Sequence, residues 1–193
     1  MKLSYHFPTV IGSYNDEKFV DHIYPFIKNI LDNDNSLYWN YKTTFPNDDI
    51  NLLLAQNKDI QEYILNLANK FANEMNLHLS KDIIICPFVT RMMKGDNHNK
   101  HNHPNAILSG LIYLNVPEGS SPVVFHDTNN IRVYNKLFPT KETFQNRDRI
   151  SYMPKKGDVL IWESFIDHEV PLNEADNRET LVFNIAYKTN HSS

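Results

Sequence analysis

The 193 residues carry 41% hydrophobic and 22% charged side chains with a formal net charge of −4, a composition typical of one globular domain. There is no basic excess to indicate nucleic-acid binding, no apolar run long enough for a membrane span, and no glycine-rich phosphate loop. A single cysteine, Cys86, excludes an internal disulfide and suits a reducing compartment, so we expect a cytoplasmic protein.

The first eighty residues are predicted to be largely helical. Segments 16–31 and 58–75 carry apolar residues at helical spacing, which we interpret as core contacts. The first helix is expected to begin at Asn15 or Asp16 as N-cap and to bend at Pro25.

After residue 80 the sequence changes to short β-rich runs separated by turn residues. Strands are predicted at 82–93, 107–116, 121–126, 148–153, 158–163, 168–171 and 179–188. Residues 128–147 are expected to form a lid or an irregular loop. Cys86 lies in an apolar run, which favours a buried structural thiol. Helices followed by strands favour an antiparallel sheet or barrel with helices packed outside it.

Three histidines have a spacing that indicates a metal site. His101 and His103 are two residues apart on an extended segment, so their side chains point to the same face. His168, from another strand, could close a facial site that keeps open positions. Imidazole suits Fe, Zn, Cu and Ni, so these residues alone do not identify the metal, and an isolated H-x-H pair is more often two loop histidines. His98 could compete with His101.

Strand alternation predicts a polar pocket beside these histidines. In 107–115, Ser109 and Tyr113 project to one face; in 178–186, Arg178 and Asn184 share a face, and apolar residues take the other. An inward arginine needs an anionic partner, and its planar fork matches a carboxylate, although a surface arginine would also fit the preceding polar loop. Gly110, inside a strand, indicates the close approach of a ligand or of another backbone.

These motifs resemble those of the Fe(II)/2-oxoglutarate dioxygenases, particularly the prolyl-hydroxylase-like branch and a small phage and bacterial group with an H-x-H-P…SG-x-x-Y pattern. Gly95 lies six residues before His101, and the next strand ends in Tyr113-Leu-Asn115. The resemblance covers roughly residues 80–188. Its distal half includes KKGDVLIW at 155–162, HEVP at 168–171, Asn177-Arg178, and Phe183-Asn184.

The resemblance implies a mainly β (α+β) fold, a double-stranded β-helix or jelly roll with N-terminal helices packed on the major sheet. It also implies a single domain over 1–193, with a helical part at 1–80 and a jelly-roll core at 81–190. The expected cofactors are Fe(II) and 2-oxoglutarate. O2 and 2-oxoglutarate would be consumed, succinate and CO2 released, and an unidentified primary substrate hydroxylated, in a host cytoplasm if the chain is phage-encoded.

The resemblance further assigns roles to individual residues. His101, His103 and His168 would hold the iron, and Arg178 would hold the distal carboxylate of 2-oxoglutarate with the help of Tyr113. Ser109 and Asn184 are further candidates for the cofactor site.

One departure from the wider superfamily leaves the ligand set open. Most members use H-x-D, whereas His103 stands at the aspartate position here. Three neutral histidines leave two positive charges on Fe(II), where a carboxylate would leave one. Asp127, at the end of a predicted strand, is the best candidate for a substitute ligand.

Two other functions fit the same residues. A cupin-like, three-histidine metal dioxygenase would work without 2-oxoglutarate and use Arg178 for its substrate's carboxylate. A non-catalytic jelly-roll module would bind a small anion and use the metal as a structural clip. The sequence identifies neither the primary substrate nor the oligomeric state.

Overall fold

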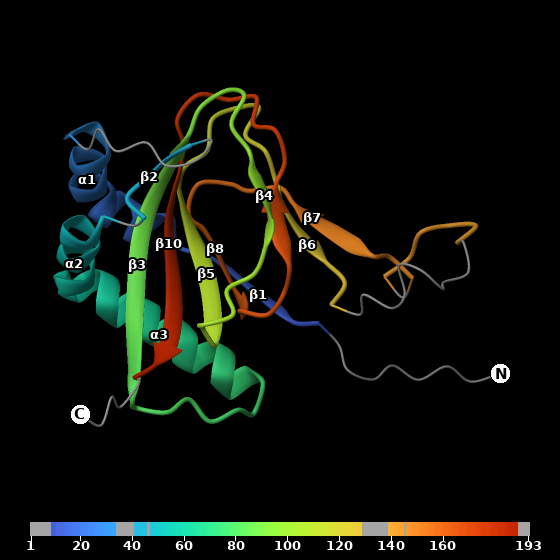
Figure 1. Ribbon diagram of the computed structural model, residues 1–193, viewed down its shortest axis with the longest axis horizontal. Coiled ribbons are helices and arrows are strands. Elements are labelled where there is room, and N and C mark those ends of the chain that lie inside the picture. Colours follow the sequence, from blue (N-terminus) through green and yellow to red (C-terminus); the bar gives the residue numbers. More distant parts are fainter. Residues whose placement is uncertain (1–8, 34–40, 46, 129–138, 145, 189–193) are drawn as a thin grey trace.

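Two antiparallel sheets face each other in the structure, a computed structural model that describes residues 9–33, 41–45, 47–128, 139–144 and 146–188 (Figure 1). In the major sheet the order is β1 (Ile11–Asn15), β8 (Asp158–Glu163), β5 (Leu108–Asn115), β10 (Arg178–Tyr187), β3 (Ile83–Met92) and β2 (Lys42–Thr43). In the minor sheet the order is β4 (His98–His101), β9 (His168–Val170), β6 (Val123–His126) and β7 (Arg149–Tyr152). This is the predicted jelly roll.

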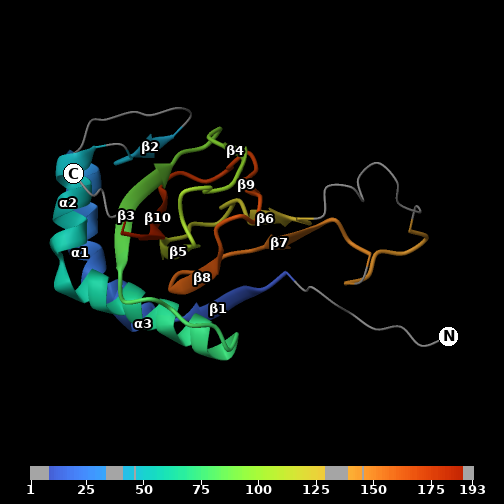
Figure 2. The ribbon, with the colours of Figure 1, turned by 60° about the horizontal axis from the view of Figure 1, so that its bottom comes forward.

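Three helices cover the outer face of the major sheet, as Figures 1 and 2 show: α1 (Glu17–Asn33), α2 (Asp48–Gln56) and α3 (Lys58–Glu74). The carboxylate of Asp16 caps α1 by accepting from Phe19 N at 3.0 Å, and α1 continues through Pro25. Asn57 caps α3 in the same way, accepting from Ile60 N at 3.2 Å. The helices at 16–31 and 58–75 are thus confirmed.

All seven predicted strands are present, each within two residues of its expected ends. The sequence did not reveal α2 or three of the strands, because each is short. Of these four elements, β1 has five residues, β2 two, β4 four and α2 nine, with only Leu54 of α2 buried. Part of the expected lid or loop at 128–147, namely 129–138 and 145, lies outside the described residues.

The outer face of the major sheet is an apolar core shared with the helices. Leu181, Phe183 and Ile185 of β10 are fully buried there. Gly110 of β5 permits this packing, since a Cβ at that position would lie 2.2 Å from Phe183 Cζ and 2.6 Å from the carbonyl oxygen of Leu160. The close approach expected at Gly110 is therefore that of a neighbouring strand and an aromatic ring.

The inner face of the major sheet packs against the minor sheet. A second apolar cluster lies between them: Leu111, Tyr113, Val123, Phe125, Leu160, Trp162 and Ile166. The predicted alternation is confirmed, because Leu111 and Tyr113 belong to this cluster whereas Leu108, Ile112 and Leu114 belong to the helix-side core.

The prediction that Cys86 is a buried thiol is wrong, because Cys86 is exposed. It pairs with Asn184 across β3 and β10, near the end of β3 that extends past the smaller minor sheet (Figure 1). An apolar run predicts a strand, but it does not show where the facing sheet stops.

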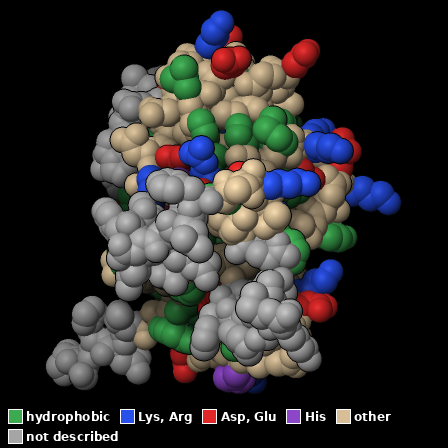
Figure 3. All heavy atoms as spheres, turned by 90° about the vertical axis from the view of Figure 1, so that its right-hand side faces the viewer, with side chains coloured by type: hydrophobic (Ala, Val, Ile, Leu, Met, Phe, Trp, Pro, Cys, Tyr) green, Lys and Arg blue, Asp and Glu red, His purple; other side chains and the backbone are tan. Residues whose placement is uncertain are grey.

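The surface carries charges of both signs. On the face shown in Figure 3, acidic and basic side chains are interspersed. Among the described residues, no helix combines the length and the apolar character that crossing a membrane requires.

Candidate metal centre

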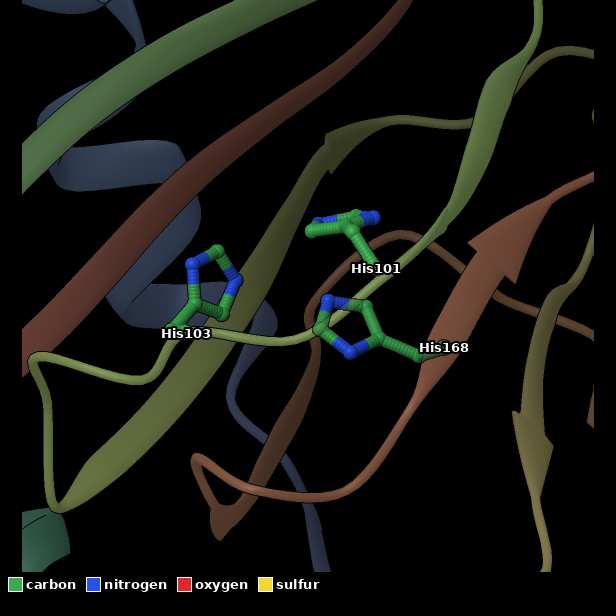
Figure 4. A group of neighbouring side chains, drawn as sticks. All are labelled: His101, His103 and His168. Atoms are coloured by element: carbon green, nitrogen blue, oxygen red, sulfur yellow. The ribbon is translucent and has the colours of Figure 1, made fainter. Parts of the chain in front are cut away.

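His101, His103 and His168 converge on one point between the two sheets (Figure 4). One ring nitrogen from each lies within 4.8 Å of the others. His101 ends β4 and pairs directly with His168, the first residue of β9. His103 follows two residues later, where its backbone N–H donates to Ser164 O at 2.9 Å. The register of two adjacent strands therefore brings together residues that are distant in the sequence.

Backbone carbonyls orient two of the three rings. His101 Nδ1 lies 2.8 Å from Asn99 O, and His168 Nδ1 lies 3.0 Å from Ile166 O. Since a carbonyl can only accept, each Nδ1 carries the proton and each Nε2 keeps its lone pair. This is how outer hydrogen bonds prepare metal-binding histidines.

The site keeps its imidazoles neutral. Burial, reinforced by the charges of neighbouring histidines, lowers the pKa of His168 to about 3 and that of His103 to about 4. Burial also lowers the pKa of His101. Neutral imidazole is the form that binds a metal ion.

His98 lies beside the three histidines but is not one of the group. Its ring stacks on His101 with centroids 3.9 Å apart, and both of its nitrogens lie 3.3 Å from Tyr41 Oη. Asp127, proposed from the sequence as a substitute ligand, also falls outside the group of converging nitrogens. Its backbone N–H donates to Asp148 O at 2.7 Å, past the end of β6. The described residues therefore offer a three-histidine donor set.

Arg178 is buried on the inner face of β10 with 2% of its surface exposed. Its guanidinium contacts neutral groups: Nε donates to Ser121 O at 3.1 Å, Nη2 lies 3.4 Å from Tyr113 Oη, and Nη1 lies 3.5 Å from Met92 Sδ. Among the described residues, no carboxylate forms an ion pair with it. Burial lowers the pKa of Arg178, with Tyr113 opposing that effect. A buried cation without a counter-ion is costly, so this position suits an anionic ligand.

Ser109 and Asn184 lie at the other end of the inner face from Arg178. Ser109 Oγ donates to Asn184 Oδ1 at 2.7 Å and lies 2.8 Å from Ser164 Oγ. Asn184 lies six positions along β10 from Arg178, which is roughly 20 Å at the usual rise per residue. The four predicted cofactor residues therefore form two separate pairs, Arg178 with Tyr113 and Ser109 with Asn184.

A pocket of about 560 Å³ opens beside the histidines. Tyr41, Phe45 and Phe88 form an aromatic wall, and the Phe45 and Phe88 ring centroids are 5.4 Å apart. The lining also includes Asn99 and Asn184. Sequence reasoning missed all three aromatic residues. Only Phe88 could have been found from the sequence, because it lies in a predicted strand whose alternate residues share one face.

A family described as "Putative 2OG-Fe(II) oxygenase" matches residues 88–184, just over half of the chain. The match contains all three histidines and Arg178. The chain belongs to this family. As a member, the oxygenase is an enzyme that uses Fe(II) and 2-oxoglutarate, as the sequence predicted. Neither the cupin-like alternative nor the anion-binding module gains similar support. No curated protein matches the sequence significantly.

Solved structures share the fold of the oxygenase at low sequence identity. A prolyl-4-hydroxylase from Pseudomonas putida has a TM-score of 0.63 and 11% identity over 93% of this chain and 94% of that chain. A prolyl hydroxylase from Trichoplax adhaerens, in complex with a hypoxia inducible factor peptide fragment, has a TM-score of 0.62 and 10% identity over 92% and 83%. HygX from Streptomyces hygroscopicus, with nickel and 2-oxoglutarate bound, has a TM-score of 0.58 and 12% identity over 94% and 84%. The double-stranded β-helix is thus confirmed.

The residues present fit both cofactors. Nitrogen ligands bind first-row metals at about 2.0–2.1 Å, so small side-chain rotations would bring the three lone pairs within reach of one ion. The guanidinium of Arg178, which has no carboxylate partner in the described part of the chain, offers two N–H groups to a carboxylate.

Proposed function

We propose that His101, His103 and His168 hold Fe(II), and that Arg178 and Tyr113 hold the distal carboxylate of 2-oxoglutarate, in an enzyme that hydroxylates its substrate. The observation that carries this proposal is Arg178, a buried cation without a carboxylate partner among the described residues. The second feature is the group of three converging imidazoles, which burial keeps neutral. The family's two cofactors match these two features.

Each group has a task that follows from its surroundings. When bound, the iron and 2-oxoglutarate supply the oxidation, in which O2 is consumed and succinate and CO2 are released. The two carbonyl-oriented rings offer Nε2 without reorganisation. Arg178 provides a two-point, charge-assisted contact that fixes the direction of the co-substrate. The apolar residues around Tyr113 exclude water, which strengthens this contact.

The primary substrate is proposed to enter through the pocket lined by Tyr41, Phe45 and Phe88. This pocket reaches two of the proposed ligands, His101 and His103, and its aromatic wall is partly open, with Phe45 46% exposed. Exposed aromatic residues beside a concave site favour contact with a ligand.

The wider setting is proposed on less specific grounds. The helices and the major sheet share one apolar core, which supports a single domain over 1–193. One cysteine and a net charge of −4 support a cytoplasmic enzyme that does not bind nucleic acid.

The decisive experiment is Arg178→Ala, with Mn(II) and 2-oxoglutarate affinities measured by anaerobic titration calorimetry. Removing one partner of a buried charge pair costs roughly 3–5 kcal/mol, so 2-oxoglutarate affinity should fall by more than about a hundredfold. Metal affinity should change little, because the arginine does not touch the histidines' ligand atoms.

Arg91→Ala is the matched control. Arg91 is also an arginine of the major sheet, but it pairs with Glu179 at 2.6 Å and with Asp32 at 2.7 Å on the helix side. Its removal should leave 2-oxoglutarate affinity unchanged. Equal 2-oxoglutarate binding by Arg178→Ala and wild type would overturn the assigned role.

A further inference from the structure

The buried side-chain amide of Asn173 does not contact Arg178, but it is hydrogen-bonded to two residues that do. Two of the three contacts of Arg178 are with Ser121 and Met92, and both of these residues are hydrogen-bonded to Asn173. Asn173 Oδ1 accepts from Ser121 N at 3.1 Å, and the carbonyl of the same Ser121 accepts from Arg178 Nε. Asn173 Nδ2 lies 3.4 Å from the backbone oxygen of Met92, and the sulfur of the same methionine contacts Arg178 Nη1.

Asn173 is fully buried and uses its whole hydrogen-bonding capacity. The two hydrogens of Nδ2 serve three carbonyl oxygens, those of Ala175 at 2.6 Å, Met93 at 3.1 Å and Met92 at 3.4 Å, so one hydrogen is shared between two acceptors. Its backbone N–H donates to Asp96 O, and its carbonyl accepts from Gly95 N, both at 2.8 Å. One residue therefore ties the end of β3, the segment before β6 and the connection from β9 to β10 around the guanidinium.

We infer that Asn173 is a positioning residue that sets the selectivity of the oxygenase for 2-oxo acids with a distal carboxylate. This rests on the proposed role of Arg178. An arginine side chain loses several rotatable bonds of freedom when it binds, and a site that fixes it beforehand removes that cost from ligand binding. Ser121 O and Met92 Sδ provide this fixation, and Asn173 fixes them.

The chemistry at this position requires an amide. It must accept from one N–H and donate to carbonyl oxygens at the same time, as Asn does. An ionised Asp has no donor for those carbonyls, and Leu has neither group. In the described part of the chain, the side chain of Asn173 has no hydrogen bond to a proposed metal ligand or to Arg178, so its effect should appear only through the arginine.

Two related acids separate this role from a merely structural one. 2-Oxoglutarate and 2-oxobutyrate have the same metal-chelating end, but only 2-oxoglutarate has the distal carboxylate. Asn173→Ala and Asn173→Ser are compared with wild type, each loaded with Mn(II), and the dissociation constants of both acids are measured by calorimetry. Loss of positioning should weaken 2-oxoglutarate by about tenfold and change 2-oxobutyrate by less than about twofold.

Asn57→Ala is the control for general destabilisation, because it removes a helix cap on the far side of the major sheet. It should leave the ratio of the two affinities unchanged. If the Asn173 variants bind both acids more weakly by the same factor, or bind both as wild type does, the ratio of the two affinities is unchanged and the inference is overturned. A wild-type protein that does not prefer 2-oxoglutarate would instead refute the proposed role of Arg178.

A measurement on the wild type keeps the inference testable if both Asn173 variants fail to fold. In ¹⁵N NMR of the unliganded protein, the Nε–H of Arg178 and the Nδ2–H₂ of Asn173 should exchange slowly with water and at matching rates, whereas exposed Arg147 exchanges fast. Fast exchange at Arg178 would show that the guanidinium is not held and would overturn the inference.

Discussion

The two faces of β10 are both buried but differ in chemical character. Toward the helices, Leu181, Phe183 and Ile185 are completely buried in an apolar core. Toward the minor sheet, the same strand carries Arg178 and Thr180, which are equally buried but polar. A strand with period two can thus serve two environments 180° apart.

The helix-side face of β10 stabilises the fold, whereas its inner face contributes to the candidate site. The helix-side face gains free energy by removing apolar surface from water. The inner face gives some of it up, because the Arg178 guanidinium has lost water without gaining a carboxylate partner among the described residues. Substitutions on the two faces should therefore have opposite signatures in the absence of ligands.

The largest effect is expected from Phe183→Ala. Loss of a fully buried ring should lower the free energy of unfolding by about 3–5 kcal/mol. Arg178→Met, on the opposite face, should leave the metal-free protein as stable as wild type or more so, because it removes a buried charge that has only neutral contacts among the described residues. Urea unfolding of both variants measures the contrast. A large loss of stability in Arg178→Met would contradict the view that the buried arginine on the inner face costs stability.

A smaller effect is expected at the unusual ligand position. His103→Ala should weaken Fe(II) binding by on the order of a hundredfold, since loss of a direct ligand should cost at least as much as loss of an outer partner. His103→Asp should bind Fe(II) more weakly than wild type but more tightly than His103→Ala, because a carboxylate oxygen can bind the ion but the aspartate side chain is shorter. Anaerobic Fe(II) titration ranks the three proteins. Equal affinities would remove His103 from the ligand set and favour Asp127.

The inner face should also make the metal-free protein sensitive to acid. His168 and His103 protonate in the folded state only near pH 3 and 4, whereas an unfolded imidazole protonates near 6.5. Between these values the unfolded chain binds more protons, so the free energy of unfolding should fall as the pH drops below about 6.5, by up to about 1.4 kcal/mol per unit for each histidine. The free energy of unfolding, measured with urea at pH 7 and at pH 5, should fall less between these two pH values in His168→Gln than in wild type. An equal fall in both proteins would contradict this explanation.

The smallest effect is expected far from the site. Asn57→Ala removes the cap of α3 and should cost about 1 kcal/mol of stability. Metal and 2-oxoglutarate affinities should stay at their wild-type values when measured by calorimetry. A change in either affinity would show that the helix side is coupled to the chemistry.

Local pattern accounts for what the sequence predicted well. Alternation in 107–115 and 178–186 identified both faces of two central strands, and it correctly put Tyr113 and Arg178 on the same side. The H-x-H pair and the distant His168 were recognisable because their residue types and spacing carry the chemistry themselves.

Features that depend on distant elements could not be predicted in this way. Tyr41 and Phe45 reach the pocket from a segment without periodic pattern, and Asn173 gains its importance from three segments that meet around it. The exposure of Cys86 depends on where the minor sheet ends. Alternation put Ser109 and Asn184 on the same side as Arg178, but it does not show how far along the strand they lie from it.

The cross-strand pairing of His101 with His168 has a consequence for how the chain folds. These residues come from distant parts of the sequence, so closing the loop between them carries an entropic cost that local helices do not share. The three nitrogens can meet only after β4 and β9 have joined, which makes metal capture a late event in folding. Time-resolved metal uptake during refolding would then follow completion of the minor sheet, well after the helices have formed.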